Sequence, residues 1–236
     1  MEIAEIKKLL EKVDGWISDE EGELLFNLAK NCKGKGVIVE IGSWKGRSTI
    51  WLGLGSKQGS QAKVYAVDPH TGSKVHTEMY GKVWTFDEFK MNIKMANLSD
   101  VVIPVVKTSA EAAKNFNMPV ELIFIDGDHE YDAVKLDFDL WFPKLVDGGI
   151  MAFDDTVVAP GPKKVVDEFL YKSKNFGKVK TVGKITFAQK VRQNSLRGML
   201  VNRLVLVVKN AYISAGKLPF PKPFRAIGRK LIRLIQ

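Results

Sequence analysis

Acidic side chains stand at or beside the ends of several apolar, strand-length segments of this chain. In sequence order they are Glu40, Asp68, Asp126, Asp154 and Asp155. A single aspartate after a strand is usually a helix cap or a turn former. Parallel strands, however, end at the same edge of a sheet, and ligands bind at that edge. The spacing therefore predicts a shared site whose carboxylates bind a cation, a hydroxyl-rich ligand or a hard metal ion.

A turn with two glycines follows the first of these segments. Gly42 and Gly46 stand four residues apart, and Glu40 precedes them in the pattern E-x-G-x-x-x-G. Glycine allows a sharp turn and the close approach of a ligand to the backbone, and the helix that follows begins with unpaired N–H groups. A dinucleotide fingerprint needs three glycines, and the Glu40 carboxylate would repel a pyrophosphate. The alternatives are a site for a cationic or hydroxyl-rich ligand and an ordinary strand–turn–helix corner.

Strands and helices alternate along the chain, as in α/β proteins with a parallel sheet. The expected strands cover residues 37–41, 64–68, 101–106, 121–126 and 149–153. The expected helices cover residues 2–13, 18–31, 85–97, a stretch after Tyr131, and 160–171. Ser18 and Glu21 form a capping-box signature at the start of the second helix. Residues 178–182 and 184–190, joined at Gly183, predict a closing hairpin.

Four of these segments together resemble the class I S-adenosylmethionine-dependent O-methyltransferases. They are Glu40 to Ser48, Asp68, Phe124 to His129, and Gly148 to Asp155. Within that class the chain looks most like the group that includes macrolide-sugar and other small-molecule O-methyltransferases. The resemblance covers residues 16–190 and is specific for fold and cofactor, but much less so for the substrate. It implies an α/β fold: a Rossmann-like, seven-stranded, mostly parallel sheet with helices on both faces and a C-terminal antiparallel hairpin.

The resemblance also implies roles for individual residues. Those expected to bind S-adenosylmethionine are Glu40, Gly42, Ser43, Gly46, Ser48, Asp68, Ser109 and Ala110. Those that match metal-ligating positions of the metal-dependent families are Asp126, Asp154 and Asp155. The catechol and caffeoyl-coenzyme A types have Asp-Asn where this chain has Asp154-Asp155, so the acidic pair is closer to the macrolide-sugar type. The residues expected to act in catalysis are His129, Asp126 and Asp154.

Two mechanisms fit these carboxylates. In the first, they hold a divalent ion, Mg²⁺, which stabilises the ionised hydroxyl of a small-molecule or saccharide acceptor. In the second, no metal takes part, and His129 accepts the proton while Asp154 or Asp155 orients it or the substrate. The two are compatible, and we expect a metal together with His129. The plainer alternative is that Asp128 and His129 only begin the next helix as caps.

Composition indicates one α/β domain with appendages in 236 residues. The expected organisation is N-terminal helices in 1–35, the S-adenosylmethionine-binding domain in 36–190 and a basic tail in 191–236. The single cysteine, Cys32, excludes an intrachain disulfide framework and a cysteine-rich zinc site. The first residues are acidic and lack an apolar core, which predicts no signal peptide and a cytoplasmic location.

Charge is divided unevenly along the chain. Residues 1–168 contain all 27 acidic residues and 20 basic ones, whereas 169–236 contain the other 16 basic residues and no acid. On a helical wheel, residues 224–236 separate into an apolar arc and an arc of arginine and lysine. This pattern is typical of a helix at an anionic membrane surface, here the inner face of the membrane. Alternatively the tail packs on the acidic body or on a second subunit, and we expect a homo-oligomer. The apolar arc disfavours binding to nucleic acid.

Other functions are less well supported. The missing third glycine disfavours a nicotinamide-dependent oxidoreductase, and the intact set of carboxylates disfavours a non-catalytic membrane adaptor built on the same fold. Residues 70–84 predict a long irregular connection, either a lid over the site or a solvated insertion. His70 and His76 in this connection are weaker candidates for catalysis than His129.

Overall fold

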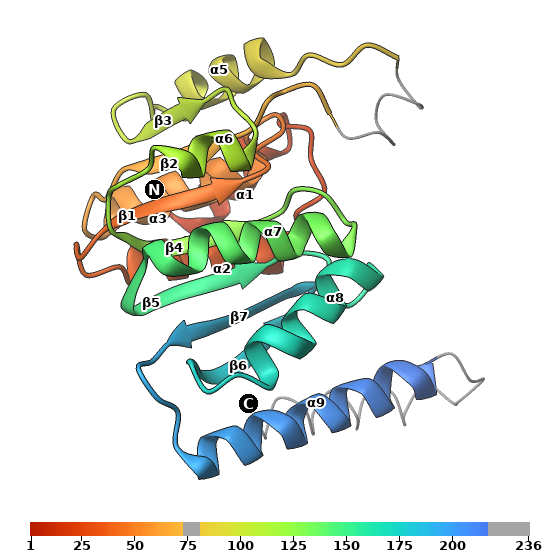
Figure 1. Cartoon of the computed structure of the whole chain (residues 1–236). Coiled ribbons are helices and arrows are strands. Elements are labelled where there is room, and N and C mark those ends of the chain that lie inside the picture. Colours follow the sequence, from red (N-terminus) through yellow and green to blue (C-terminus); the bar gives the residue numbers. More distant parts are fainter. Residues whose placement is uncertain (73–80, 217–236) are drawn as a thin grey trace.

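A seven-stranded sheet forms the centre of the protein, with strand order β3-β2-β1-β4-β5-β7-β6 (Figure 1). The computed structural model describes residues 1–72 and 81–216. The strands are β1 (Val37–Ile41), β2 (Val64–Val67), β3 (Val102–Val105), β4 (Val120–Ile125), β5 (Leu145–Phe153), β6 (Phe176–Val182) and β7 (Ile185–Lys190). Strands β1 to β5 are parallel, and β7 pairs antiparallel with both β5 and β6. The predicted fold class is confirmed, although β5 begins at Leu145 rather than at Gly149.

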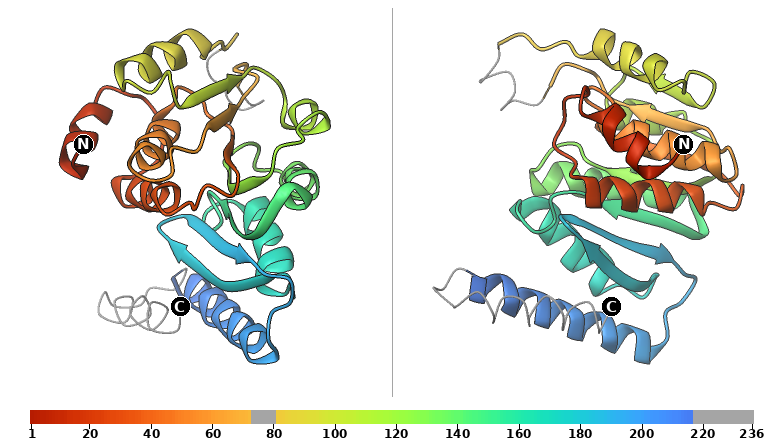
Figure 2. Two further views of the ribbon diagram at one scale, coloured as in Figure 1. Left: turned by 90° about the vertical axis from the view of Figure 1, so that its left-hand side faces the viewer. Right: turned by 180° about the vertical axis from the view of Figure 1, so that it is seen from behind.

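Helices cover both faces of this sheet (Figure 2). One layer contains α1 (Ile3–Leu10), α2 (Asp19–Lys30), α3 (Arg47–Gln58) and α5 (Phe86–Met95). The other contains α6 (Ser109–Lys114), α7 (Tyr131–Trp141) and α8 (Pro160–Val166), with short turns η1 (Phe142–Lys144) and η2 (Asp167–Tyr171). Each layer buries its own apolar cluster against the sheet, one centred on Trp51 and Phe89 and the other on Phe138 and Trp141. The central strands β1 and β4 are buried on both faces, as expected for parallel strands that helices cover on both sides.

The capping box predicted at the start of α2 is confirmed. The Ser18 and Glu21 side chains each accept a hydrogen bond from the other residue's backbone N–H, at 3.4 and 2.9 Å. One turn into the helix, a Cβ atom on Gly22 would lie 2.0 Å from Nε1 of Trp51. This close packing joins α2 to α3, so the N-terminal helices form part of the core.

The C-terminal part begins with a long helix, α9 (Leu196–Gly216), which packs on β6 and η2. Val205 and Leu206 are buried in this contact. Among residues 1–72 and 81–216, no helix is long and apolar enough to cross a membrane. The amphipathic helix predicted over 224–236, His76 and most of the connection predicted over 70–84 lie outside the described residues. His70 is described: it is fully buried, and its Nδ1 lies 2.9 Å from Oγ1 of Thr85.

Candidate active site

Backbone pairing brings the predicted carboxylates to one edge of the sheet. Just beyond the strands, the N–H of Asp68 donates to the carbonyl of Val105, and that of Gly42 to Val67. In the same way, the N–H of Asp126 donates to Ile41, and that of Asp154 to Ile125, at 2.8 and 2.9 Å. The parallel register therefore places Asp68, Asp126 and Asp154 at one edge with Gly42, as predicted for these three carboxylates, whereas Glu40 lies inside β1, just before this edge.

The turn after β1 needs glycine for a structural reason. Gly42 has a φ of +83°, and a Cβ atom there would lie 2.0 Å from the carbonyl oxygen of Asp126. Gly46, with a φ of +91°, precedes the first residue of α3, and a Cβ atom there would lie 3.2 Å from the Phe89 ring. The close neighbours of both glycines are protein atoms. The need for glycine here is therefore explained without a ligand, and a contact with the cofactor stays a prediction.

Asp68 closes this turn onto the end of β2. Its Oδ2 accepts hydrogen bonds from the backbone N–H groups of Ser43 and Trp44 at 2.9 and 2.7 Å. Its Oδ1 accepts one from the N–H of His70 at 2.6 Å. The carboxylate retains acceptor capacity, because each oxygen has a second lone pair. Asp68 therefore fixes the shape of the glycine turn and still has capacity to bind a hydroxyl.

Glu40 lies deeper than the sequence suggested. It is fully buried, and its Oε2 accepts a 2.5 Å hydrogen bond from the Thr49 hydroxyl. Its Oε1 has no partner among the described residues, and neither has the buried hydroxyl of Ser43 nearby in the turn. Burial raises the pKa of Glu40 to about 7, against hydrogen bonds from Ser48 and Thr49 that lower it. Buried polar atoms are rarely left unpaired, so these two indicate a place where a polar ligand completes the structure.

The segment that contains Ser109 and Ala110, both expected to bind the cofactor, is helical. Ser109 and Ala110 form the first turn of α6, which Thr108 caps with a hydrogen bond from the N–H of Glu111. The Ser109 hydroxyl accepts a 2.9 Å hydrogen bond from the indole N–H of Trp141. Ser109 is thus held against α7, while Ala110 is exposed at the surface.

Three side chains from the ends of the neighbouring strands β4 and β5 converge at the same sheet edge as the glycine turn. Asp126, His129 and Asp155 each offer an atom of metal-ligand type, and these atoms lie within 4.8 Å of one another. Nε2 of His129 lies 3.0 Å from Oδ2 of Asp155. Asp154 is not part of this trio, although its buried Oδ1 has no partner among the described residues. The closest candidate set for a cation therefore differs from the predicted one by His129 in place of Asp154.

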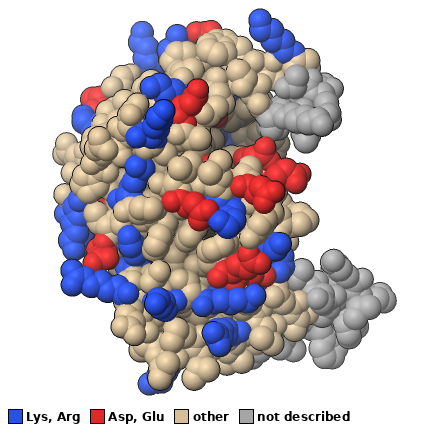
Figure 3. Space-filling model, in the orientation of Figure 1, with Lys and Arg blue, Asp and Glu red and all other residues tan. Residues whose placement is uncertain are grey.

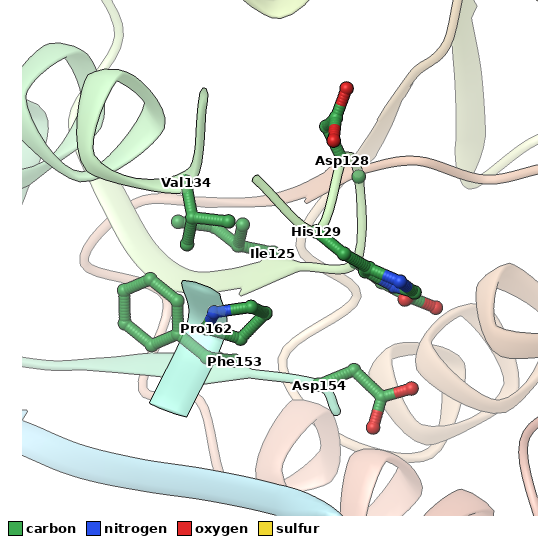
Figure 4. Close-up of a pocket in the computed structure, with 9 residues that line it drawn as sticks. Ile125, Asp128, His129, Val134, Phe153, Asp154 and Pro162 are labelled. Atoms are coloured by element: carbon green, nitrogen blue, oxygen red, sulfur yellow. The ribbon is translucent and has the colours of Figure 1, made fainter. Parts of the chain in front are cut away.

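In the loop after β4, the side chains of the adjacent residues Asp128 and His129 point in different directions. Oδ1 of Asp128 accepts a 2.9 Å hydrogen bond from the N–H of Glu130, so Asp128 acts as a turn former ahead of α7. In Figure 4 its carboxylate points away from the His129 ring and from Asp154. A small hollow with an apolar inner wall lies beside these residues; the wall consists of Ile125, Val134, Phe153 and Pro162. The capping alternative holds for neither residue, because the N-cap of α7 is Glu130 and Asp128 forms the turn before it. His129 pairs with Asp155 instead.

Lys184 completes the cluster, and the sequence did not predict it. From the turn between β6 and β7, its Nζ donates to Oδ1 of Asp155 at 2.8 Å and to Oδ2 of Asp154 at 3.3 Å. The turn is fixed by the Thr156 hydroxyl, which donates to the Lys184 carbonyl at 2.8 Å, and by Glu21, which accepts from the Lys184 N–H at 2.7 Å. Lys184 is thus a built-in cation facing the acidic pair.

The charges of this cluster act on one another. Burial raises the pKa of Asp126 well above its ordinary value, and the charges of Asp154 and Asp155 add to the effect. Burial also raises the pKa of Asp154, although the charge of Lys184 opposes it. The hydrogen bond from His129, together with Lys184, lowers the pKa of Asp155 to about 2 despite its burial. The same bond to Asp155 raises the pKa of His129. The cluster therefore holds an ionised Asp155 between the Lys184 ammonium group and the His129 ring, and a group of shifted pKa values of this kind is typical of functional sites.

A family of proteins described as "Methyltransferase domain" matches residues 39–156, which is half of the chain. The chain belongs to this methyltransferase-domain family. The match runs from β1 to Thr156 and so includes every strand end described above. The expected class I methyltransferase fold is confirmed.

Two curated relatives match about half of the chain, and both are uncharacterised proteins. The chain is 32% identical over 123 residues to the uncharacterised protein y4gI of Sinorhizobium fredii, a match that covers 51% of this chain and 13% of that protein. It is 27% identical over 120 residues to the uncharacterised protein R132 of Acanthamoeba polyphaga mimivirus, half of each chain. The matched part is thus half or less of either relative.

Solved structures of O-methyltransferases share the fold. The O-methyltransferase NovP has a TM-score of 0.65 at 19% identity, over 75% of this chain and 81% of its own. TomG from Streptomyces achromogenes, solved with S-adenosylmethionine, has a TM-score of 0.57 at 15% identity, over 80% and 89%. A Bacillus cereus O-methyltransferase, solved with S-adenosylhomocysteine, has a TM-score of 0.55 at 21% identity, over 80% and 90%.

Proposed function

We propose that this methyltransferase domain transfers the methyl group of S-adenosylmethionine to a hydroxyl of a sugar or another small molecule. The observation that carries the proposal is the His129–Asp155 pair, which lies beside Asp126 at the same sheet edge as the glycine turn. A histidine oriented by a carboxylate is a general base for a hydroxyl. A base at the same sheet edge as a turn with unpaired buried polar atoms supports a methyl acceptor that binds beside the expected cofactor.

The cofactor supplies a methyl group already activated on a sulfonium sulfur, so the protein mainly has to position the reactants. Glu40 and Ser43 would bind polar groups of the cofactor through their unpaired atoms. Asp68 would accept a hydrogen bond from a hydroxyl while it keeps the turn closed. Gly46, Ser48, Ser109 and Ala110 keep the cofactor-binding roles that the resemblance implies for them.

His129 is arranged to take a proton. Because Asp155 can only accept, Nε2 of His129 carries the hydrogen in their 3.0 Å contact. In the neutral ring Nδ1 then carries the lone pair, and it would accept the proton of the acceptor hydroxyl. Asp155 stabilises the imidazolium that results, since the hydrogen bond between them favours the charged ring.

The donor set also fits a divalent ion. Asp126 and Asp155 would hold it, with Asp154 or His129 as a further ligand, and carboxylate oxygens are the ligands that Mg²⁺ prefers. A His129 ring that bound the ion through its lone pair would not also act as the base. Such an ion would acidify the bound hydroxyl of the acceptor. The metal assignment rests on this geometry and on the resemblance.

Lys184 favours a metal-independent enzyme as the second candidate. Its ammonium group already bonds to both Asp154 and Asp155. A cation supplied by the protein would stabilise these carboxylates in place of a metal, and His129 would then act as base alone.

A methyl-transfer assay with and without metal separates these candidates. The protein is incubated with S-adenosylmethionine and a panel of sugars and phenols, in Mg²⁺ or in EDTA, and products are detected by mass. We expect methylated product, and its loss in His129→Ala while S-adenosylhomocysteine still raises the melting temperature. No thermal response to S-adenosylhomocysteine would overturn the proposal. Full activity in EDTA would select the metal-independent candidate.

A further inference from the structure

Helix α9 carries a row of exposed aliphatic side chains on its outer face. Leu196, Leu200, Leu204 and Val207 are 77%, 66%, 54% and 63% exposed. At about 100° per residue they fall within an arc of about 80°. Solvent-exposed leucines spaced this regularly are unusual for a helix that already packs on a domain, because its outer face is normally polar.

The opposite face of α9 is fixed to the protein. Val205 and Leu206 are buried there, and the Asn202 amide accepts from the N–H of Val179 at 3.2 Å and donates to the carbonyl of Gly177 at 2.8 Å. Helix α9 therefore lies along the β6 end of the sheet, with its aliphatic row turned outward.

Positive charge borders the row on both sides. Arg203 and Arg197 are exposed and stand at the two edges of the aliphatic arc on the helical wheel. No acidic residue occurs anywhere in 169–236. In Figure 3 the lower end of the molecule, where α9 lies, shows basic and uncharged surface but no acidic side chains.

We propose that the outer face of α9 is a docking surface for an anionic lipid bilayer. An aliphatic row flanked by arginines matches the boundary between acyl chains and anionic headgroups. Charge disfavours the two other candidates for covering the row. One candidate is a second copy of α9, which would bring arginines against arginines. The other is residues 217–236 of the same chain, which contain six basic residues and no acid and would likewise bring positive charge against these arginines. The proposal does not depend on the proposed enzymatic activity.

Vesicle co-sedimentation of the full chain tests this. Wild type and the variant Leu200→Ser/Leu204→Ser are compared on vesicles of phosphatidylglycerol mixed with phosphatidylcholine, and on phosphatidylcholine alone. The matched control is Leu136→Ser, because Leu136 is a 49% exposed leucine on α7, away from this face. We expect wild type and the control to bind the anionic vesicles, and the α9 variant to bind them about tenfold more weakly.

The basic tail would itself attract anionic vesicles, so the comparison is repeated in a chain with a neutralised tail. The same pair is compared in a chain in which Arg225, Arg229, Lys230 and Arg233 are replaced by Gln, and the loss caused by the α9 variant should persist there. Equal binding of variant and wild type to anionic vesicles, in both the natural and the neutralised-tail chains, would overturn the proposal. Failure of the wild type to bind anionic vesicles would also overturn it. So would a variant that keeps its vesicle binding but changes from dimer to monomer on size-exclusion chromatography, because the row would then be an interface between copies.

Discussion

Replacing Glu40 with glutamine tests two effects of this carboxylate separately: its cost to the stability of the folded protein and its contribution to cofactor binding. The carboxylate is fully buried, one oxygen is unpaired, and its pKa is raised to about 7. A glutamine side chain at this position would have almost the same shape and could still accept the hydrogen bond from Thr49. We therefore expect Glu40→Gln to stabilise the ligand-free protein at alkaline pH and to weaken cofactor binding.

The size of the effect follows from the pKa. A rise from 4.5 to about 7 corresponds to about 3 kcal/mol, at about 1.4 kcal/mol per pH unit. Between these values the folded protein binds a proton that the unfolded chain has lost, so stability falls as pH rises from 4.5 to 7. Glutamine does not ionise, so Glu40→Gln does not lose stability in this way between pH 4.5 and 7. Above pH 7 it should be more stable than wild type by up to about 3 kcal/mol, whereas near pH 4.5 the two should be alike.

Urea unfolding at pH 5 and pH 8.5, without ligand, measures this difference. The matched control is Glu11→Gln, an exposed glutamate at the end of α1, whose stability difference from wild type should not change between the two pH values. The second readout is the rise in melting temperature on adding S-adenosylhomocysteine, which should shrink in Glu40→Gln only. A difference between wild type and Glu40→Gln that is the same at both pH values would refute the argument.

Four further substitutions test the site. His129→Gln should lower the transfer rate by about 10²–10⁴-fold. In a pH–rate profile, wild-type activity should increase as pH rises through the pKa of His129, which the bond to Asp155 raises. Asp155→Asn should shift this increase in activity to lower pH. Lys184→Met should lower the free energy of unfolding in EDTA by about 1–3 kcal/mol yet increase stabilisation by Mg²⁺; equal stabilisation of variant and wild type would contradict competition between Lys184 and a metal. Gly42→Ala should cost about 2–4 kcal/mol in urea unfolding, because its Cβ atom meets the Asp126 carbonyl.

The order of the elements could be predicted because local signals agreed with tertiary structure. Apolar runs of strand length, glycine turns and the Ser18 capping box each mark an element that the structure contains. Parallel pairing then brings the strand ends together, so the positions of Asp68 and Asp126 followed from the pattern. The short helix that begins at Ser109 was missed, because six residues are too few to show helical periodicity.

The depth of a side chain was harder to predict than its place along the strand. Glu40 and Asp126 belong to neighbouring strand ends, yet Glu40 is fully buried and Asp126 is only half-buried. The difference arises because the Glu40 carboxyl turns under α3, where Thr49 donates to it. A sequence shows that a carboxylate follows a strand, but the helix packed above the strand decides whether that carboxylate reaches the surface.

Lys184 shows which signal would have been needed to predict the whole cluster. In the antiparallel pair of β5 and β7, Phe153 lies opposite Thr186. Continuing this register by two residues sets Lys184 opposite Asp155, where its ammonium group bonds to the acidic pair. The hairpin was predicted, but its register against β5 was not, and a shift of one residue would turn each side chain to the other face. The turn before the last strand can therefore supply a cation for the acidic pair. Comparing Lys184→Met with wild type in Mg²⁺ and in EDTA tests whether Lys184 or a metal ion provides the positive charge there.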